Sequence, residues 1–268
     1  MKKVFALILC VSLLLCGCSA APQSIKDDNP VVPETVKSVW MAYFELEKYT
    51  SECADSNSFE SEIKSAFKKV KSLGLNTITV QVRPCADAFY KSSYFPVSKY
   101  CFGVQGSELI YDPLAIMVKA AHNLGLRIEA WINPYRVSQE NDIDALSSGN
   151  PAKKWLEDSE KSSCVYVADK IYFNPARSEV TELIVNGVKE IVKNYAVDGI
   201  HFDDYFYPTT NEEIDEKEYS QYQSSDGDMG LSDWRRNNVC EMIKAVYKAV
   251  KEENSSVMFG ISPQSKVS

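Results

Sequence analysis

The 268-residue sequence alternates short strand-like runs with longer helix-like runs, and this alternation is the feature that most constrains its fold. In the helix-like runs, apolar residues recur at intervals of three and four, as in Ile63, Phe67 and Val70. Parallel strands need a long crossover between them, usually a helix, so the alternation predicts an α/β protein with a parallel sheet. We expect strands at 38–46, 76–84, 126–136, from 197 to a loop at 203, and at 256–262. We expect helices at 58–73, 112–125, 151–156, 175–195 and 232–251.

Two long segments, 85–111 and 137–174, both follow the ends of expected strands. In a (β/α)8 barrel, loops in this position build the active site. The competing architecture is a Rossmann sheet, but no G-x-G-x-x-G follows the first strand and no Walker A motif occurs. We therefore predict a TIM-barrel-type fold with only about five of its eight βα units before Ser268. We expect a truncated gene product; the alternative is a sheet that is completed in some other way.

Residues 1–17 have the pattern of a bacterial signal peptide, with two lysines, an apolar run and a small residue before Cys18. The Leu-Cys-Gly-Cys sequence that ends there resembles a lipobox, which implies cleavage before Cys18, lipidation of its thiol and an anchor on the outer side of the cell membrane. The alternative is a plain secretory signal cut after a small residue such as Ala20. We expect a flexible tether at 18–37 and a partial barrel domain at 38–268.

Composition and charge exclude several classes of partner. The formal net charge is −8, from 29 Lys and Arg against 37 Asp and Glu, and no basic stripe is present, so we expect no nucleic-acid partner. Five cysteines follow Cys18 without a C-x-x-C pair, which argues against a zinc site and against a full disulfide framework. A Cys85–Cys101 bridge and free thiols are both open. We expect a monomer without an organic cofactor or a metal.

The stretch VDGIHFDDYFYP carries two adjacent carboxylates where the fourth expected strand gives way to a loop. Successive side chains of a strand point to opposite faces. Ile200 and Phe202 should therefore face covering helices, while His201 and Asp203 face the other side. Chemistry in parallel β/α folds is placed at the carboxyl ends of the strands, so Asp203 and Asp204 are candidates for an active site.

Side chains of that second face, from all five expected strands, should meet at the mouth of the barrel. Carboxylates, an arginine, an amide and aromatic rings suit a carbohydrate, because rings stack on sugar C–H surfaces and polar groups bind hydroxyls. Cleavage of a glycosidic bond requires two carboxyl groups, one as acid and one as nucleophile or base. The expected set is Tyr43, Glu45, Arg83, Trp131, Asn133, His201, Asp203 and Ser262.

Five motifs in chain order, from residue 38 to the C-terminus, resemble the glycosyl hydrolase-like family 10. They are Trp40-Met41 with Tyr43, NTITVQVRP at 76–84, AWINPY at 130–135, DGIHFDDYFYP at 198–208 and DWRR at 233–236. The resemblance implies a TIM barrel, a secreted or lipid-anchored bacterial protein and the hydrolysis of glycosidic bonds. It makes cell-envelope glycans such as peptidoglycan strands a reasonable substrate class.

The motif G-I-H-F-D also resembles a strand of amylase-like barrels whose aspartate is the nucleophile, and that position falls on Asp203. In the similar chitinase-like strand the catalytic glutamate would fall on Tyr205, so that mechanism is not supported. The candidate catalytic residues are Asp203 as nucleophile or base, Asp204 as its pKa-tuning or substrate-binding neighbour, and Glu129, for which a structural role is the alternative. Arg83 either binds sugar or forms an ion pair that keeps Asp203 charged. The expected substrate contacts are Tyr43, Arg83, Trp131, Asn133, His201 and Tyr205.

Together these patterns predict an extracytoplasmic lipoprotein that cleaves glycosidic bonds in a polysaccharide, with the activity of the truncated chain itself left open. One alternative is a non-catalytic carbohydrate-binding lipoprotein with an incomplete barrel. The other is a metal-dependent polysaccharide deacetylase in which His201, Asp203 and Asp204 would be the ligands. The sequence has only two histidines, which argues against the deacetylase.

Overall fold

The computed structural model describes residues 35–204 and 206–263. The predicted signal peptide, the lipidation site at Cys18 and nearly all of the predicted tether lie outside these residues, and so does Tyr205. No helix within the described ranges is both long and apolar enough to cross a lipid bilayer.

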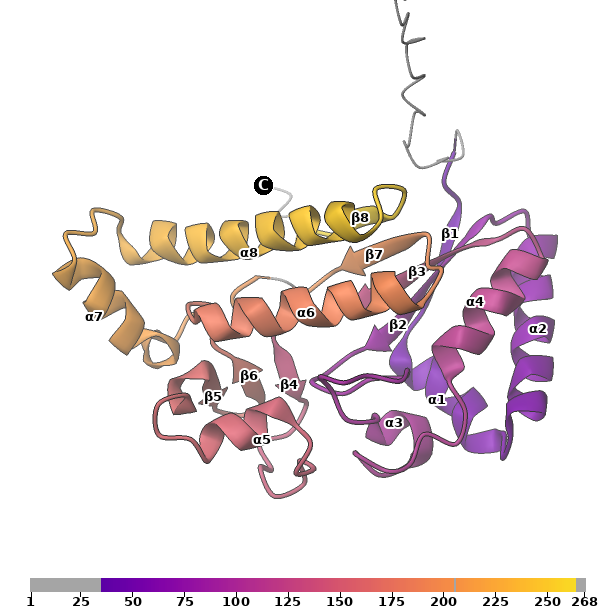
Figure 1. Cartoon of the computed structure of the whole chain (residues 1–268), viewed down its shortest axis with the longest axis horizontal. Coiled ribbons are helices and arrows are strands. Elements are labelled where there is room, and N and C mark those ends of the chain that lie inside the picture. The colour runs from indigo at the N-terminus through magenta and orange to yellow at the C-terminus, as the bar shows by residue number, and fades with distance from the viewer. Residues whose placement is uncertain (1–34, 205, 264–268) are drawn as a thin grey trace, which may run out of the picture.

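A five-stranded parallel sheet lies at the centre of the fold, in the order β1-β2-β3-β7-β8 (Figure 1). This order follows the chain without a reversal. Because crossovers between parallel strands are right-handed, an unreversed order places the connecting helices on one face of the sheet. A Rossmann sheet reverses its order and carries helices on both faces, so the barrel-type prediction is confirmed. The strands are β1 (Ser38–Met41), β2 (Thr77–Arg83), β3 (Arg127–Ile132), β7 (Gly199–Phe202) and β8 (Met258–Ile261).

The sheet is an open section of a barrel wall. Each of the five predicted βα units supplies one strand, and β1 and β8 are the two edges of the sheet within the described residues. The wall therefore has an outer face covered by helices and an inner face that would line a closed barrel. This difference between the faces determines where the candidate site lies.

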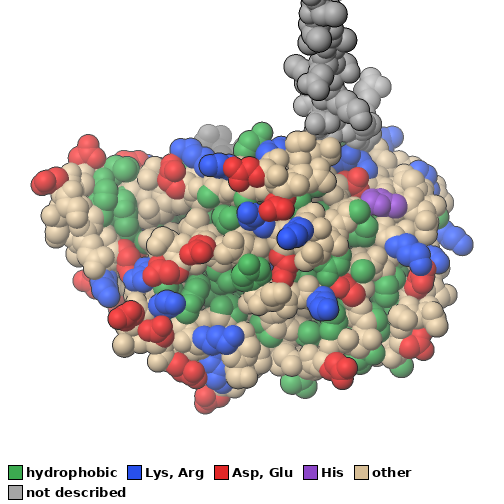
Figure 2. Space-filling model, viewed as in Figure 1, with side chains coloured by type: hydrophobic (Ala, Val, Ile, Leu, Met, Phe, Trp, Pro, Cys, Tyr) green, Lys and Arg blue, Asp and Glu red, His purple; other side chains and the backbone are tan. Residues whose placement is uncertain are grey.

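Four long helices form the outer layer, and two pairs of them, α6 with α8 and α2 with α4, pack side by side (Figure 1). Their apolar stripes are buried, as are Phe59, Ile63 and Phe67 of α2. The Asp55 carboxylate begins α2 by accepting a hydrogen bond from the Ser58 N–H at 2.9 Å. Acidic and basic side chains are interspersed over the exposed side of this layer (Figure 2). The helices are α2 (Ser56–Ser72), α4 (Pro113–Asn123), α6 (Ser178–Asn194) and α8 (Leu231–Glu253).

The first strand is shorter than the sequence predicts. The expected strand at 38–46 stops at Met41, and helix α1 (Tyr43–Glu52) begins directly after it. The Glu45 carboxylate accepts a hydrogen bond from the Ala42 N–H at 2.9 Å, which satisfies a free amide at the start of this helix. Tyr43 and Glu45 therefore lie on a helix, and the prediction that places them on a strand is wrong.

A second sheet, antiparallel and three-stranded in the order β4-β6-β5, forms in the segment that the sequence predicts as a long loop. The expected third strand at 126–136 is two strands, β3 and β4, in different sheets. The short helix expected at 151–156 is confirmed as α5. The remaining elements are β4 (Arg136–Ser138), β5 (Val165–Val167), β6 (Ile171–Phe173), α3 (Lys99–Phe102), α5 (Pro151–Leu156), α7 (Glu216–Ser224) and 3-10 turns at Ser162–Cys164 and Glu212–Ile214.

The five cysteines of the described residues are all unpaired. Either a bridge or free thiols were possible at Cys85 and Cys101. In the structure both residues are buried free thiols.

Candidate functional site

The inner face of the sheet carries polar and aromatic side chains that the helices leave uncovered. Strand register sets these residues in rows, with Thr79 beside Glu129, Gln81 beside Trp131, and Trp131 beside His201. Trp40 at the edge of the sheet is 39% exposed. Aromatic rings and hydrogen-bonding groups therefore share this face, although Thr79 and Gln81 are almost completely buried.

Asp203 stands at the carboxyl end of this face, directly after β7. Its Oδ1 accepts a hydrogen bond from Asn133 Nδ2 at 2.6 Å and another from the Asp204 backbone N–H at 2.7 Å. Asn133 directly follows β3, the strand next to β7, so the two residues meet at one edge of the sheet as the strand alternation predicts. Asn133 is almost completely buried, so its side chain has little freedom to move. It therefore holds the Asp203 carboxylate in place from one side.

Burial raises the pKa of the Asp203 carboxyl above its ordinary value. The Trp131 indole and the Asp204 amide favour the charged form and lower this pKa, and the neighbouring charges act in opposite directions, with Asp204 raising it and Arg136 lowering it. Trp131 Nε1 is buried and makes no well-aligned hydrogen bond with any described residue, although it lies near enough to Asp203 to lower the pKa of that carboxyl. A carboxyl held in this way can take up a proton at a higher pH than a solvated aspartate, which suits acid–base chemistry.

Gln81 is a site residue that is absent from the set expected from the sequence. Its Oε1 accepts a hydrogen bond from the Tyr43 backbone N–H at 3.1 Å, and its Nε2 donates to Asn133 Oδ1. The alternation of β2 placed Gln81 on the inner face, together with Arg83, and that alternation was the signal available. Arg83 was assigned to the mouth in its place.

Arg83 does not lie on the inner face. The register between β2 and β3 shifts after Gln81, so that Gln81 pairs with Trp131 but Arg83 pairs with Ile132. Such a bulge inserts one residue and moves the following side chain to the opposite face. Arg83 is 1% exposed and its guanidinium lies 4.3 Å from the centre of the Phe95 ring, under the helical layer. The prediction that Arg83 binds substrate or pairs with Asp203 is therefore wrong.

Asp204 has a different partner from Asp203. Arg136 of β4 donates a hydrogen bond from Nη2 to Asp204 Oδ2, so the small antiparallel sheet reaches the end of β7. The sequence gives no local signal for this contact, because it joins segments 68 residues apart. A cavity of about 60 Å³ beside the pair is lined by Tyr135, Arg136, Tyr172, Asp204, Phe206 and Pro208.

Glu129 of β3 and His201 of β7 lie on the same inner face, before the carboxyl ends of their strands. Glu129 accepts a hydrogen bond from Thr79 Oγ1 at 3.2 Å, and His201 Nδ1 lies 3.8 Å from Glu129 Oε2. His201 Nε2 is hydrogen-bonded to Ser262 Oγ at 2.8 Å. Burial raises the pKa of Glu129 and lowers that of His201, so the neutral forms of both are favoured.

Glu129 is held by neighbours on the inner face. It pairs across the sheet with Gly199, four residues before Asp203. Its carboxylate accepts the hydrogen bond from Thr79 and contacts His201, and both contacts fit the structural role that was the alternative for Glu129.

Tyr43 contributes to the site through its backbone. Its ring packs on Tyr100 at 4.5 Å and on Phe44 at 5.5 Å, whereas its N–H reaches Gln81. The sequence predicts that Tyr43 contacts substrate with its ring from a strand. In the structure Tyr43 lies at the N-terminus of α1, and its backbone N–H donates a hydrogen bond to Gln81.

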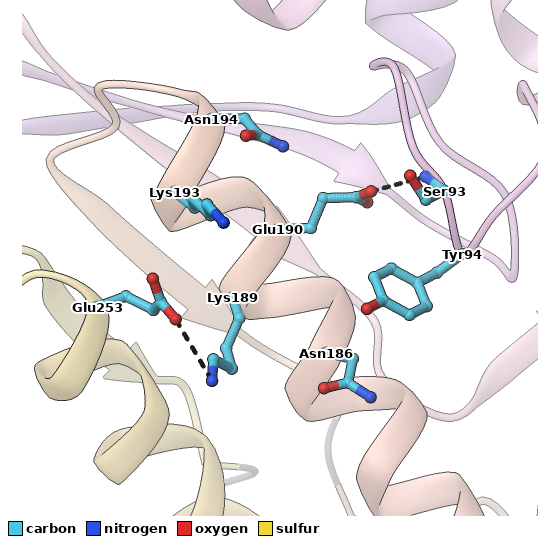
Figure 3. Close-up of a pocket in the computed structure, with 8 residues that line it drawn as sticks. All are labelled: Ser93, Tyr94, Asn186, Lys189, Glu190, Lys193, Asn194 and Glu253. Carbon is cyan, nitrogen blue, oxygen red and sulfur yellow. Dashed lines mark hydrogen bonds and ion pairs between the residues drawn. The ribbon is translucent and has the colours of Figure 1, made fainter.

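The outer layer also contains a depression, of about 370 Å³, between α6, α8 and residues 93–94 (Figure 3). Three of its four charged side chains have partners: Lys189 Nζ lies 3.3 Å from Glu253, and Glu190 accepts a hydrogen bond from the Ser93 N–H at 2.6 Å (Figure 3). Glu190 also accepts a hydrogen bond from Ser92 Oγ. Because α6 covers the opposite face of the sheet from Asp203, this depression is separate from the candidate site.

Within residues 35–204 and 206–263, no three or more His, Cys, Asp or Glu side chains are grouped in a way that could hold a metal ion.

Comparisons with known proteins agree with this placement. The family described as Glycosyl hydrolase-like 10 matches residues 35–268. Glycosyl hydrolase YngK of Bacillus subtilis is 39% identical over 201 residues, which are 72% of this chain and 38% of YngK. Glycosyl hydrolase DigH of Escherichia coli is 28% identical over 286 residues, 96% of this chain and 64% of DigH. The chain thus spans less than two thirds of either relative.

The sheet and its helices are also similar to a solved glycosidase. The alpha-L-fucosidase isoenzyme 2 of Paenibacillus thiaminolyticus superposes with a TM-score of 0.55, over 84% of this chain and 32% of its own. The sequence identity is 18%, so this likeness shows the fold alone.

Proposed function

The chain belongs to the glycosyl hydrolase-like 10 family, and we propose that it cleaves glycosidic bonds in a cell-envelope polysaccharide such as peptidoglycan strands. The single observation that carries the proposal is Asp203, a carboxyl at the mouth of the barrel wall whose Oδ1 is held by Asn133 and by the Asp204 amide. A carboxyl in this position is what glycosidic cleavage requires of its nucleophile or base.

The surrounding groups have separate roles in this proposal. Asn133 and the Asp204 amide hold Asp203 in one orientation, which lowers the entropic part of the barrier. Trp131 and Trp40 offer ring surfaces for a sugar beside the carboxyl, with their ring centres 4.7 Å apart. Asp204, held by Arg136, adjusts the charge around Asp203.

Asp203→Asn tests the role of this carboxyl. We expect release of reducing ends from glycan strands to fall by at least about 10²-fold, because the amide cannot act as nucleophile or base. Asp233→Asn is the matched control, since it removes a carboxylate from an exposed pair with Arg236. Circular dichroism establishes that both variants keep the fold. Equal turnover by the Asp203 variant and the parent chain would overturn the assignment.

A second function, carbohydrate binding without cleavage, is favoured by one observation. The described sheet is open, and the inner-face Trp40 is 39% exposed rather than enclosed. Calorimetric titration with a glycan oligosaccharide separates the two functions: saturable binding with no cleavage over days would point to a binding protein.

For location we propose an extracytoplasmic protein anchored through a lipid on Cys18, on the basis of the sequence at residues 1–18. Cys18→Ser should move the protein from the membrane fraction to the soluble extracytoplasmic fraction. A membrane-bound Cys18→Ser protein would exclude this anchor.

A further inference from the structure

Two side-chain amides in series connect the start of helix α1 to the Asp203 carboxylate. The Tyr43 N–H donates to Gln81 Oε1, Gln81 Nε2 donates to Asn133 Oδ1, and Asn133 Nδ2 donates to Asp203 Oδ1. Gln81 is 3% exposed and Asn133 1%, so water has little access to either amide. The three hydrogen bonds therefore form one continuous buried row.

The direction of this row is fixed by its first member. A side-chain amide has an accepting oxygen and a donating nitrogen, and it can turn over if its neighbours allow. A backbone N–H can only donate, and the Tyr43 N–H is one of those left free at the start of a helix. Gln81 must therefore present its oxygen to Tyr43 and its NH2 to Asn133, and Asn133 must then present its own NH2 to Asp203.

We propose that Gln81 is a positioning residue that acts through Asn133, by fixing which end of the Asn133 amide faces the Asp203 carboxylate. This inference rests on the proposed function, because Asp203 is the reacting carboxyl in it. Without Gln81, Asn133 could turn its oxygen toward Asp203, where two acceptors would face each other.

The amide row is one of several influences on Asp203, because the Trp131 indole and the Asp204 N–H also favour its charged form. The charged side chains that act on Asp203 are Asp204 of the same segment and Arg136 of β4, and they act in opposite directions. Arg136 is engaged with Asp204 Oδ2. Asn133 is the side chain that donates to Asp203 with good geometry among the described residues, so its orientation has a direct effect on the carboxylate.

Gln81→Met removes both polar contacts with little change in shape. Loss of a fixed donor makes the charged form of Asp203 less favourable, so we expect the pKa of this carboxyl to rise further. Carboxyl 13C NMR titration of aspartate-labelled protein measures this pKa, with the signal assigned by its absence in Asp203→Asn. Thr77→Val, at the other end of β2, is the control for loss of a buried polar group on that strand and should leave the pKa unchanged.

Asn133→Leu tests whether Gln81 acts through Asn133. If it does, Gln81→Met should shift the Asp203 pKa in the parent chain but add nothing in the Asn133→Leu background, a clear departure from additivity. If Gln81→Met fails to fold, Gln81→Leu removes the same two polar contacts with another uncharged side chain, and the same upward shift is expected. An unchanged Asp203 pKa in a folded variant, or equal shifts in both backgrounds, would overturn the proposal.

Kinetics separate this inference from the proposed function. With a glycan substrate, we expect kcat to fall by about 10- to 100-fold with KM nearly unchanged, because a misplaced reacting group affects the transition state rather than binding. The pKa measurement needs no turnover. If the parent chain does not cleave glycans, the proposed function fails while the NMR result still decides whether Gln81 sets the orientation of Asn133.

Discussion

The two faces of the central sheet are built from alternate residues of the same strands, yet they differ in polarity and in burial. On β3, Ile128, Ala130 and Ile132 are completely buried under helices, whereas Glu129 and Trp131, on the other face, are only partly buried. The outer face of this strand is apolar and excludes water. The inner face carries titratable groups that are only partly buried, Glu129, His201 and Asp203, and burial shifts their pKa values.

This difference shows how one strand divides its tasks. Alternation lets adjacent residues serve stability and chemistry without conflict. The division depends on register, and the bulge in β2 shows what happens when register changes: Arg83, a polar residue, is carried to the dry face and is left with two nitrogens unpartnered among the described residues.

Ile128→Ala should have the largest effect on stability. The side chain is fully buried in the outer core, and its truncation removes apolar contacts and leaves a cavity. We expect the free energy of unfolding to fall by about 2–5 kcal/mol, measured by urea denaturation, with the Asp203 pKa unchanged. A loss below about 1 kcal/mol would mean that the outer face is not the stabilising one.

Arg83→Met should have a smaller effect, although it removes a charge. Burial lowers the pKa of Arg83, and a linear apolar side chain fills similar space without unpartnered N–H groups. We expect a free energy of unfolding within about 1.5 kcal/mol of the parent chain, and unchanged turnover on glycan. A tenfold fall in kcat/KM would place Arg83 back in the site.

Glu129→Gln should have the smallest effect, visible only as a pH dependence. The folded state raises the pKa of Glu129, so it binds the proton more tightly than the unfolded state does, and this residue's contribution to stability falls as pH rises through that pKa. The glutamine variant lacks this loss. Its melting temperature relative to the parent chain should therefore increase from pH 4 to pH 7, while turnover persists. A constant difference would contradict the pKa shift, and loss of turnover would make Glu129 catalytic.

Much of the fold could be predicted because its signals are local. The apolar spacing of α2, α4, α6 and α8 and the alternation of β2 follow from contacts between near neighbours in sequence. The two faces of β7 were predicted correctly for the same reason. The start of α1 was missed because the VWMAYF run has the composition of a strand, and a hydrogen bond from Ala42 to Glu45 outweighs that tendency.

The candidate site could be predicted only in part. Asp203 and Asn133 were found because each follows a strand end directly, and parallel strands bring such ends together. Gln81 was passed over because the bulge that removes Arg83 from the inner face has no sequence mark. Arg136 was missed because β4 pairs with β6, a contact between segments that a local pattern does not connect.

The sequence by itself determined the parallel α/β architecture and the face on which Asp203 lies, since both follow from short-range periodicity. Only the tertiary structure decided which groups share that face and which of them meet. A shift of one residue in register moved Arg83 to the outer face, and the packing of α1 and β4 against the strand ends brought the Tyr43 amide to Gln81 and Arg136 to Asp204. These contacts depend on how distant segments pack, and that is why the local pattern does not contain them.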